Sequence, residues 1–274
     1  MTPSSDASLP GRQARRDAVL GPRRPAVVVG AAHGIGAAVA DELCGLGMVD
    51  EVVLVDRDAA ALAGTADRLA GQFTDVKVHT VVAALPGPRA APLTDACRLL
   101  TRPGYGVVAA GVFEGGPSLS VDSRSIERVV ATDLVGAVLA ARAVCARLAE
   151  VGGGSFVAVS SIAARIPRPE QLGYSAAKAG LSHALRVLGL EVAPLGVRVN
   201  TVAPGATDTR FIPAHLDRRR LPGGDLASYR GRIPRGSIAT AADVAQAVAL
   251  LLSPAMRHVY LHELVVDGGE SLGV

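Results

Sequence analysis

Short valine-rich runs alternate with longer alanine- and leucine-rich stretches from residue 26 to the end of the chain. Each run is almost continuously apolar, which is typical of strands buried on both faces of a parallel sheet. This alternation predicts one doubly wound α/β domain with a seven-stranded parallel sheet and right-handed crossovers. We expect strands at 26–30, 51–56, 77–83, 106–111, 155–161, 197–205 and 263–269, and helices at about 34–46, 59–71, 90–101, 122–150, 174–193 and 240–253.

Two segments depart from this pattern. Residues 1–25 are rich in arginine and have no apolar core of a secretory signal, so we expect a disordered basic tail rather than an arm that binds nucleic acid. The domain is therefore expected to span 26–274. Residues 205–236 are rich in arginine, proline and glycine and follow the end of a predicted strand, where ligands of such sheets bind. We interpret them as a lid over the site, with a disordered segment as the alternative.

The composition excludes several classes of function. Aromatic residues make up 3% of the chain and tryptophan is absent, which argues against nucleic-acid binding by base stacking. We find no run of 18 apolar residues, so no membrane partner is expected. Cys44, Cys97 and Cys145 are widely spaced and odd in number, which indicates buried thiols in the reducing cytoplasm and neither disulfides nor a metal site.

A glycine-rich turn joins the first predicted strand to the first predicted helix. Gly30, Gly34 and Gly36 follow the spacing GxxxGxG, with His33 and Ile35 between them. Glycines let the backbone approach a pyrophosphate, and a helix N-terminus offers N–H groups to that anion. A plain tight turn is the alternative for an isolated glycine triplet, but its place between strand and helix favours a dinucleotide site in a Rossmann fold.

Asp56 ends the second predicted strand, 20 residues after Gly36. A carboxylate there accepts hydrogen bonds from the ribose hydroxyls of NAD and repels the 2′-phosphate of NADP. Arg57 and His33 are nearby cations that argue for NADP instead. We expect NAD, because Asp56 holds the strand end and Arg57 is read as a solvated charge.

Lys178 is one of only two lysines in the chain, and it follows Tyr174 by four residues on a predicted helix. Residues at this spacing share one face of a helix. A phenol has a pKa of about 10, and a nearby ammonium and a positive nicotinamide ring favour its ionised form. Ser161, at the end of the fifth predicted strand, would hydrogen-bond the reacting oxygen. The alternative is that both side chains only decorate an amphipathic helix.

Together these motifs resemble the classical short-chain dehydrogenase/reductase family. They are "GAAHGIG", "AAG" (109–111), "SS" (160–161), "YSAAK", "VNTVAPG" and "VVDGG". The resemblance implies hydride transfer with NAD(P), a homotetramer, and Ser161, Tyr174 and Lys178 as the catalytic triad. It also implies that residues 200–209 lie near the nicotinamide. On this basis the cofactor residues include Ala110, Gly111, Tyr174, Lys178, Pro204, Thr207 and Thr209.

Three positions depart from the family pattern. The helix asparagine that helps to hold a proton-relay water falls at Asp133, which is kept as a candidate catalytic residue. The acidic residue that contacts adenine after the third strand is missing, and Val82 and Ala83 stand there. The asparagine of the NAG motif is replaced around Val108. A more apolar adenine site is expected, with Val82 in it.

Within the family, three stretches resemble dehydrogenases of catecholate siderophore pathways: "PGATDT" (204–209), "IPRGSIA" (233–239) and "HVYLHELVVDGGESLGV" (258–274). The implied substrate is 2,3-dihydro-2,3-dihydroxybenzoate, a small cyclic hydroxy acid whose oxidised ring becomes aromatic. Its carboxylate needs a cation in an apolar pocket. We expect Arg168 to bind it, with Arg210 as second choice, although a solvated loop arginine remains open.

Other functions stay open at this point. The substrate could instead be an amino-substituted dihydro-hydroxybenzoate, a dihydro-hydroxyanthranilate, which the sequence does not distinguish. A 3-oxoacyl thioester reductase would prefer NADPH and a basic residue at position 56, so Asp56 counts against it. A catalytically silent NAD-binding protein on the same fold would be expected to lose Tyr174 or Lys178.

Overall fold

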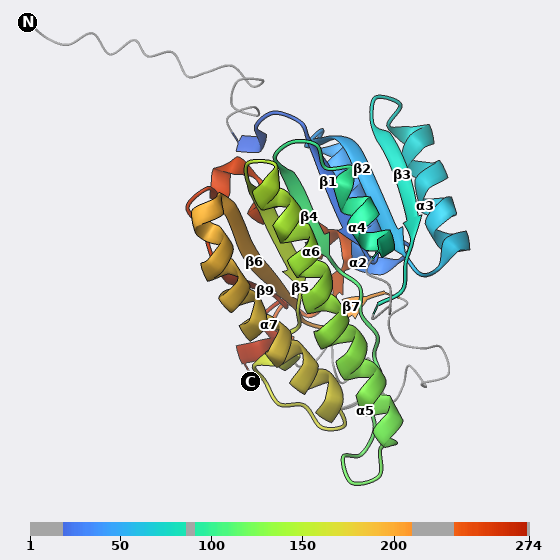
Figure 1. Ribbon diagram of the computed structural model, residues 1–274. Helices are drawn as coiled ribbons and strands as arrows, with labels where there is room; N and C mark the ends of the chain where they lie inside the picture. The colour runs from blue at the N-terminus through green and yellow to red at the C-terminus, as the bar shows by residue number, and fades with distance from the viewer. Residues whose placement is uncertain (1–18, 86–90, 210–232, 273–274) are drawn as a thin grey trace, which may run out of the picture.

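The computed structural model describes residues 19–85, 91–209 and 233–272, which form a sheet with helices on both faces (Figure 1). The seven strands are all parallel, in the order β3-β2-β1-β4-β5-β6-β9. The predicted α/β fold and its seven strands are confirmed. The strands are β1 (Arg24–Val29), β2 (Val49–Asp56), β3 (Lys77–Val82), β4 (Gly104–Val108), β5 (Gly154–Val159), β6 (Val197–Pro204) and β9 (Glu263–Val266).

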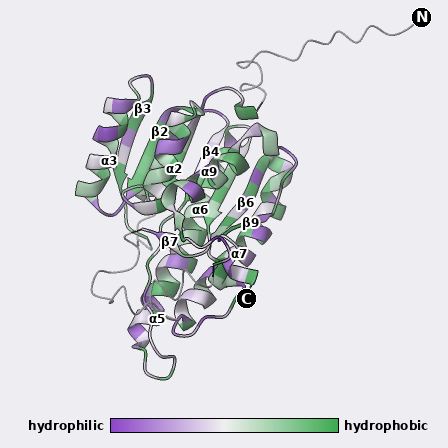
Figure 2. Cartoon of the chain, turned by 180° about the vertical axis from the view of Figure 1, so that it is seen from behind, coloured by the Kyte–Doolittle hydropathy of each residue, from purple (hydrophilic) through white to green (hydrophobic). Residues whose placement is uncertain are grey.

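Alternate side chains of each central strand enter two separate cores. In β1, Ala26 and Val28 join the core under one set of helices, and Val27 and Val29 join the other. This is the two-residue period of a strand buried on both faces. Figure 2 shows the strands as largely hydrophobic. The first core is covered by α2 (Gly34–Gly45), α3 (Ala59–Gln72) and α9 (Ala241–Leu252), and the second by α4 (Ala91–Arg98), α6 (Ala137–Glu150) and α7 (Leu172–Val192).

The helix expected at 122–150 is not uniform. It consists of α5 (Ser123–Val129), a π-helical segment η1 (Val130–Gly136) and α6. Turns of this wider kind inside α-helices are frequently found at functional sites. Residues 123–150 are long and apolar enough to cross a membrane by length and composition, and in this fold α6 packs on β4, β5, α4 and α7.

Both ends of the predicted lid are held together by a small two-stranded sheet. Its strands are β7 (Thr207–Asp208) and β8 (Ala239–Thr240), and neither was expected from the sequence. The middle of the predicted lid, like residues 1–18 of the predicted tail, lies outside the described residues. β1 begins at Arg24, inside the range expected to be tail.

Gly36 packs the first turn of α2 directly against the end of β1. A Cβ atom at Gly36 would collide with the carbonyl oxygen of Gly30, whereas a Cβ at Gly64 in α3 would meet nothing within 4 Å. Gly36→Ala is therefore expected to lower the free energy of unfolding by about 3 kcal/mol, because backbone atoms must move. Gly64→Ala is the matched control and is expected to raise it by about 0.5–1 kcal/mol through helix propensity.

Urea unfolding followed by circular dichroism measures both changes. Equal stability of the two variants would contradict the packing described for the turn after β1.

Candidate active site

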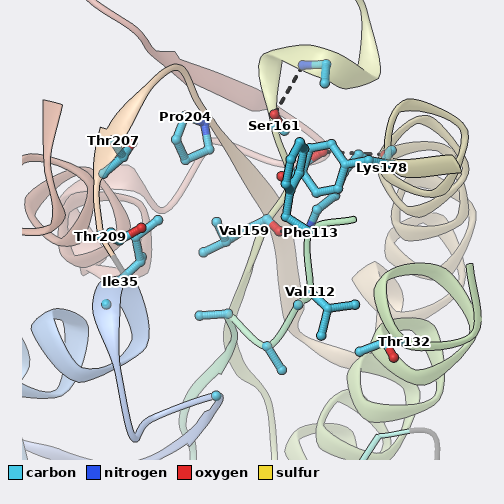
Figure 3. A pocket seen from close by; sticks show the side chains of 18 of the residues that line it. Ile35, Val112, Phe113, Thr132, Val159, Ser161, Lys178, Pro204, Thr207 and Thr209 are labelled. Carbon is cyan, nitrogen blue, oxygen red and sulfur yellow. Dashed lines mark hydrogen bonds between the residues drawn. The ribbon is translucent and has the colours of Figure 1, made fainter. Parts of the chain in front are cut away.

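A cleft of about 1140 Å³ opens at the carboxyl ends of the parallel strands. Ligands of open α/β sheets bind at this edge. In Figure 3, Ile35, Thr207 and Thr209 lie on one side of it and Ser161, Phe113 and Lys178 on the other. The residues predicted from the sequence that line the cleft are Gly30, His33, Gly34, Ile35, Asp56, Arg57, Ala110, Gly111, Ser161, Arg168, Tyr174, Lys178, Pro204, Thr207 and Thr209.

Four predicted site residues are placed differently. Gly36 lies in α2, behind the wall of the cleft, where it allows the close packing described above. Val82 ends β3 and is not among the lining residues, whereas its neighbour Ala83 is. Asp133 lies behind the wall, buried against Lys178. Arg210 lies outside the described residues.

The glycine turn has the geometry of a phosphate cradle. Gly30 has φ of +88°, and a Cβ there would collide with the backbone at Ala110. Gly34 has φ of +53°, and His33 precedes α2 without a side-chain cap. Because no side chain intrudes, an anion can approach the N-terminus of α2 closely. These residues fit the pyrophosphate of a dinucleotide.

Asp56 points its carboxylate into the same half of the cleft. One oxygen accepts a hydrogen bond from Ala32 N at 3.0 Å, and the other accepts one from Asp58 N at 3.1 Å. His33 Nε2 lies 2.9 Å from the carboxylate of Asp58, and this hydrogen bond lowers the pKa of Asp58. The imidazole of His33 therefore has a carboxylate partner that the sequence did not point to.

Tyr174 and Lys178 leave α7 on its face toward the cleft. Tyr174 is 8% exposed and Lys178 is 3% exposed. The lysine Nζ lies 5.6 Å from the centre of the tyrosine ring, and Phe113 packs edge-on against that ring with centroids 5.1 Å apart. Ser161 follows β5 and its Oγ accepts a hydrogen bond from Ala163 N at 3.2 Å. The three residues expected to act together are brought to one wall.

Asp133 forms a buried ion pair with Lys178. Its Oδ2 lies 3.2 Å from Lys178 Nζ, and its Oδ1 accepts a hydrogen bond from Val112 N at 2.7 Å. Lys178 also donates to the carbonyl of Val159 at 3.2 Å. Asp133 is fully buried in the π-helical segment. The sequence singled out Asp133 for a water relay, but not for direct contact with the lysine.

Burial and these charges act on the acidities in opposite directions. Burial raises the pKa of Tyr174, Lys178 lowers it, Asp133 raises it and the hydrogen bond with Ser161 lowers it, with a net rise. Burial lowers the pKa of Lys178, but Asp133 and Tyr174 outweigh this, so the lysine stays an ammonium. Lys178 lowers the pKa of Tyr174 as expected, but the desolvation of the phenol, which the sequence did not reveal, raises this pKa by more.

Arg168 is paired with a carboxylate that the sequence did not point to. Glu270, in the short helix η5 (Glu270–Leu272), lies 2.8 Å from the Arg168 guanidinium. Its other oxygen accepts a hydrogen bond from Ala206 N at 2.7 Å. Both side chains line the cleft. Among the described residues no group of three His, Cys, Asp or Glu side chains could hold a metal ion.

The profile of the family described as enoyl-(acyl carrier protein) reductase matches residues 30–271 of this chain. Solved structures with the same fold include short-chain dehydrogenases. The chain belongs to the short-chain dehydrogenase/reductase family, and it is a dehydrogenase.

Two relatives and one solved structure are similar to the chain over most of its length. The chain is 30% identical to vibriobactin-specific 2,3-dihydro-2,3-dihydroxybenzoate dehydrogenase of Vibrio cholerae, covering 90% of this chain and 95% of the relative. It is 35% identical to cis-4-hydroxycyclohexanecarboxylate dehydrogenase of Sinomonas cyclohexanicum, covering 90% and 96%. Carveol dehydrogenase from Mycobacterium avium in complex with NAD has a TM-score of 0.81 at 25% identity, covering 92% and 98%.

Proposed function

We propose that this protein oxidises a ring alcohol of a six-membered cyclic carboxylate, with NAD as the hydride acceptor. The observation that carries the proposal is one cleft that holds Ser161, Tyr174 and Lys178 together with Arg168. Such a wall combines a proton acceptor with a cation for an acidic substrate. The preferred substrate is 2,3-dihydro-2,3-dihydroxybenzoate or a ring analogue, as used in siderophore or other secondary-metabolite biosynthesis.

The names of the relatives support this substrate class. One acts on a cyclohexadiene carboxylate that carries two hydroxyl groups, and the other acts on a hydroxylated cyclohexane carboxylate. Both substrates combine a six-membered ring, a secondary alcohol and a carboxylate. The diene substrate has an additional driving force, because its ketone product tautomerises to an aromatic ring.

In the proposed reaction Tyr174 accepts the proton of the ring hydroxyl. When bound, NAD would accept the hydride from the carbon atom that carries this hydroxyl, and its oxidised nicotinamide ring would bring a positive charge. Ser161 donates a hydrogen bond to the reacting oxygen and fixes its position. Lys178 is buried close to Tyr174 and stabilises the phenolate form. Phe113 holds the tyrosine ring from the side.

Arg168 is the proposed partner of the substrate carboxylate. Its side chain is 19% exposed on the cleft, and Glu270 fixes its position. Glu270 also competes for the same guanidinium, so an incoming carboxylate must share it. We therefore assign specificity for acids to the pair rather than to the arginine alone. Arg210, the second choice, lies outside the described residues.

NAD is preferred over NADP in this proposal. The Asp56 carboxylate is held at the end of β2 by two backbone N–H groups, and Asp58 adds a second carboxylate nearby. A 2′-phosphate placed there would meet negative charge. Arg57 is exposed, and His33 is already paired with Asp58.

A homotetramer in the cytoplasm completes the proposal. Leu139 on α6 and Val187 and Leu190 on α7 are exposed apolar side chains on neighbouring helices, which suits burial between subunits. The cysteines at 44, 97 and 145 are all buried and unpaired, as in a reducing compartment. Light scattering coupled to gel filtration tests the assembly.

The direct test of the function is an assay with 2,3-dihydro-2,3-dihydroxybenzoate and NAD. NADH absorbance and the fluorescence of the catechol product should rise together, and Tyr174→Phe should abolish both. cis-4-Hydroxycyclohexanecarboxylate and an amino-substituted diene acid are tested in parallel to rank the ring substituents. If none of the three acids reduces NAD, the proposal is wrong.

The charge balance of the cleft gives a paired prediction. Arg168→Ala should raise the KM for the acid by about 10- to 100-fold, because a charge-assisted hydrogen bond is lost. Glu270→Gln keeps an acceptor for Ala206 N and removes the competing charge, so KM should fall about three-fold. The KM for NAD should stay unchanged in both. Equal kinetics of the wild type with the acid and its methyl ester would contradict this role.

A second prediction concerns the cofactor. Asp56→Ser should raise the KM for NAD about ten-fold and improve the use of NADP, because it removes the carboxylate that faces the adenosine ribose. Asp67→Ser, an exposed aspartate on α3 away from the cleft, is the control. The ratio of kcat/KM for NAD and NADP measures the effect. An unchanged ratio in Asp56→Ser would show that another group selects the cofactor.

A further inference from the structure

The carboxyl group of Asp133 is buried directly behind the proposed catalytic lysine, where burial raises its pKa and Lys178 and Val112 N lower it. Asp133 Oδ2 and Lys178 Nζ lie 3.2 Å apart, and both side chains are almost completely shielded from solvent. A Cβ atom on Gly111 would lie 2.8 Å from Asp133 Oδ2, so the carboxylate packs closely against the chain after β4. The fold thus places the Asp133 carboxyl group in contact with the ammonium that assists Tyr174.

The charged groups that face this site come from few elements. α7 contributes Tyr174 and Lys178, η1 contributes Asp133, and the segment after β5 contributes the hydroxyl of Ser161. From the chain after β4, Val112 donates its N–H to Asp133. Among the described residues no other charged side chain contributes to the acidity of Tyr174 or Lys178. The three ionisable groups therefore form one coupled unit.

We propose that Asp133 is a positioning residue that raises the working pH of the Tyr174–Lys178 pair. It keeps Lys178 protonated and holds its ammonium in place, but it also cancels much of the positive charge that would ionise the tyrosine. The kinetic part of this inference rests on the proposed function. The spectroscopic part does not.

A carboxylate stabilises the protonated form of each neighbour, because that form is more positive. With Lys178 held as an ammonium, the proton that leaves the pair comes from the phenol. Removing the carboxylate therefore lowers the pH at which Tyr174 ionises. Asp133→Asn is the suitable change, because its amide oxygen can still accept the hydrogen bond from Val112 N.

Tyrosine absorbance tests the inference without any substrate. The chain has four tyrosines and no tryptophan, so the near-ultraviolet signal of tyrosinate is easily followed. The difference between each protein and its Tyr174→Phe counterpart isolates the titration of Tyr174. In Asp133→Asn this titration should move to lower pH by about one pH unit. Asp67→Asn, which removes an exposed carboxylate, should leave it unchanged.

Kinetics test the same shift in both reaction directions. Oxidation requires the deprotonated pair. The acid limb of the pH profile of kcat/KM for oxidation should therefore move to lower pH by about one unit in Asp133→Asn. Reduction requires the protonated pair, so its alkaline limb should move by the same amount and in the same direction. If Asp133 served only for packing, Asp133→Asn would lower the maximal kcat/KM in both directions and leave the limbs of both pH profiles at the same pH.

The outcomes separate the two proposals. A shifted tyrosine titration together with shifted limbs supports the inference. An unshifted titration in a folded Asp133→Asn variant that binds NADH normally overturns it, whatever the activity. A shifted titration in a protein that oxidises no ring alcohol supports the role of Asp133 and rejects the proposed function. If Asp133→Asn does not fold, the same titration is made with Asp133→Ser, and an unshifted result there also overturns the inference.

Discussion

The buried contact between Lys178 and Asp133 is the interaction on which the site depends most. Removing two charges from water is costly, and the cost is offset only when geometry and further hydrogen bonds are good. Val112 N and the carbonyl of Val159 supply those hydrogen bonds, one to each partner. The π-helical turn brings the carboxylate to this point, and α7 brings the ammonium. The pair thus ties the chain after β4 and the end of β5 to the two helices.

The rest of the fold places this pair at the cleft that opens at the carboxyl ends of the strands. Parallel strands all end at one edge, so β1, β2, β4, β5 and β6 contribute neighbouring residues to one cleft. The first turn of α2 can approach closely because Gly36 has no side chain. Arg168 and Glu270 join the chain before α7 to the chain end after β9. Both ion pairs therefore lie at the cleft of this short-chain dehydrogenase.

Much of this arrangement could be predicted from the sequence. Continuous apolar runs located the strands, and the motifs around Gly30, Ser161 and Tyr174 located most of the cleft. The contacts between charges could not be predicted, because Asp133 and Lys178, or Arg168 and Glu270, are far apart in the chain. The sequence around the π-helical segment η1 also does not distinguish it from an ordinary α-helix. At the end of β3, Ala83 lines the cleft in place of the predicted Val82, one residue away.

The most direct test of the account is the activity of Lys178→Arg. The guanidinium keeps the positive charge, but its planar fork does not fit the compact space between Tyr174, Val159 and Asp133. We expect folded protein that binds NADH, checked by thermal unfolding and fluorescence titration, with kcat for ring-alcohol oxidation at least about 100-fold lower. Turnover at the wild-type rate would contradict the role assigned to the lysine and to its buried partner.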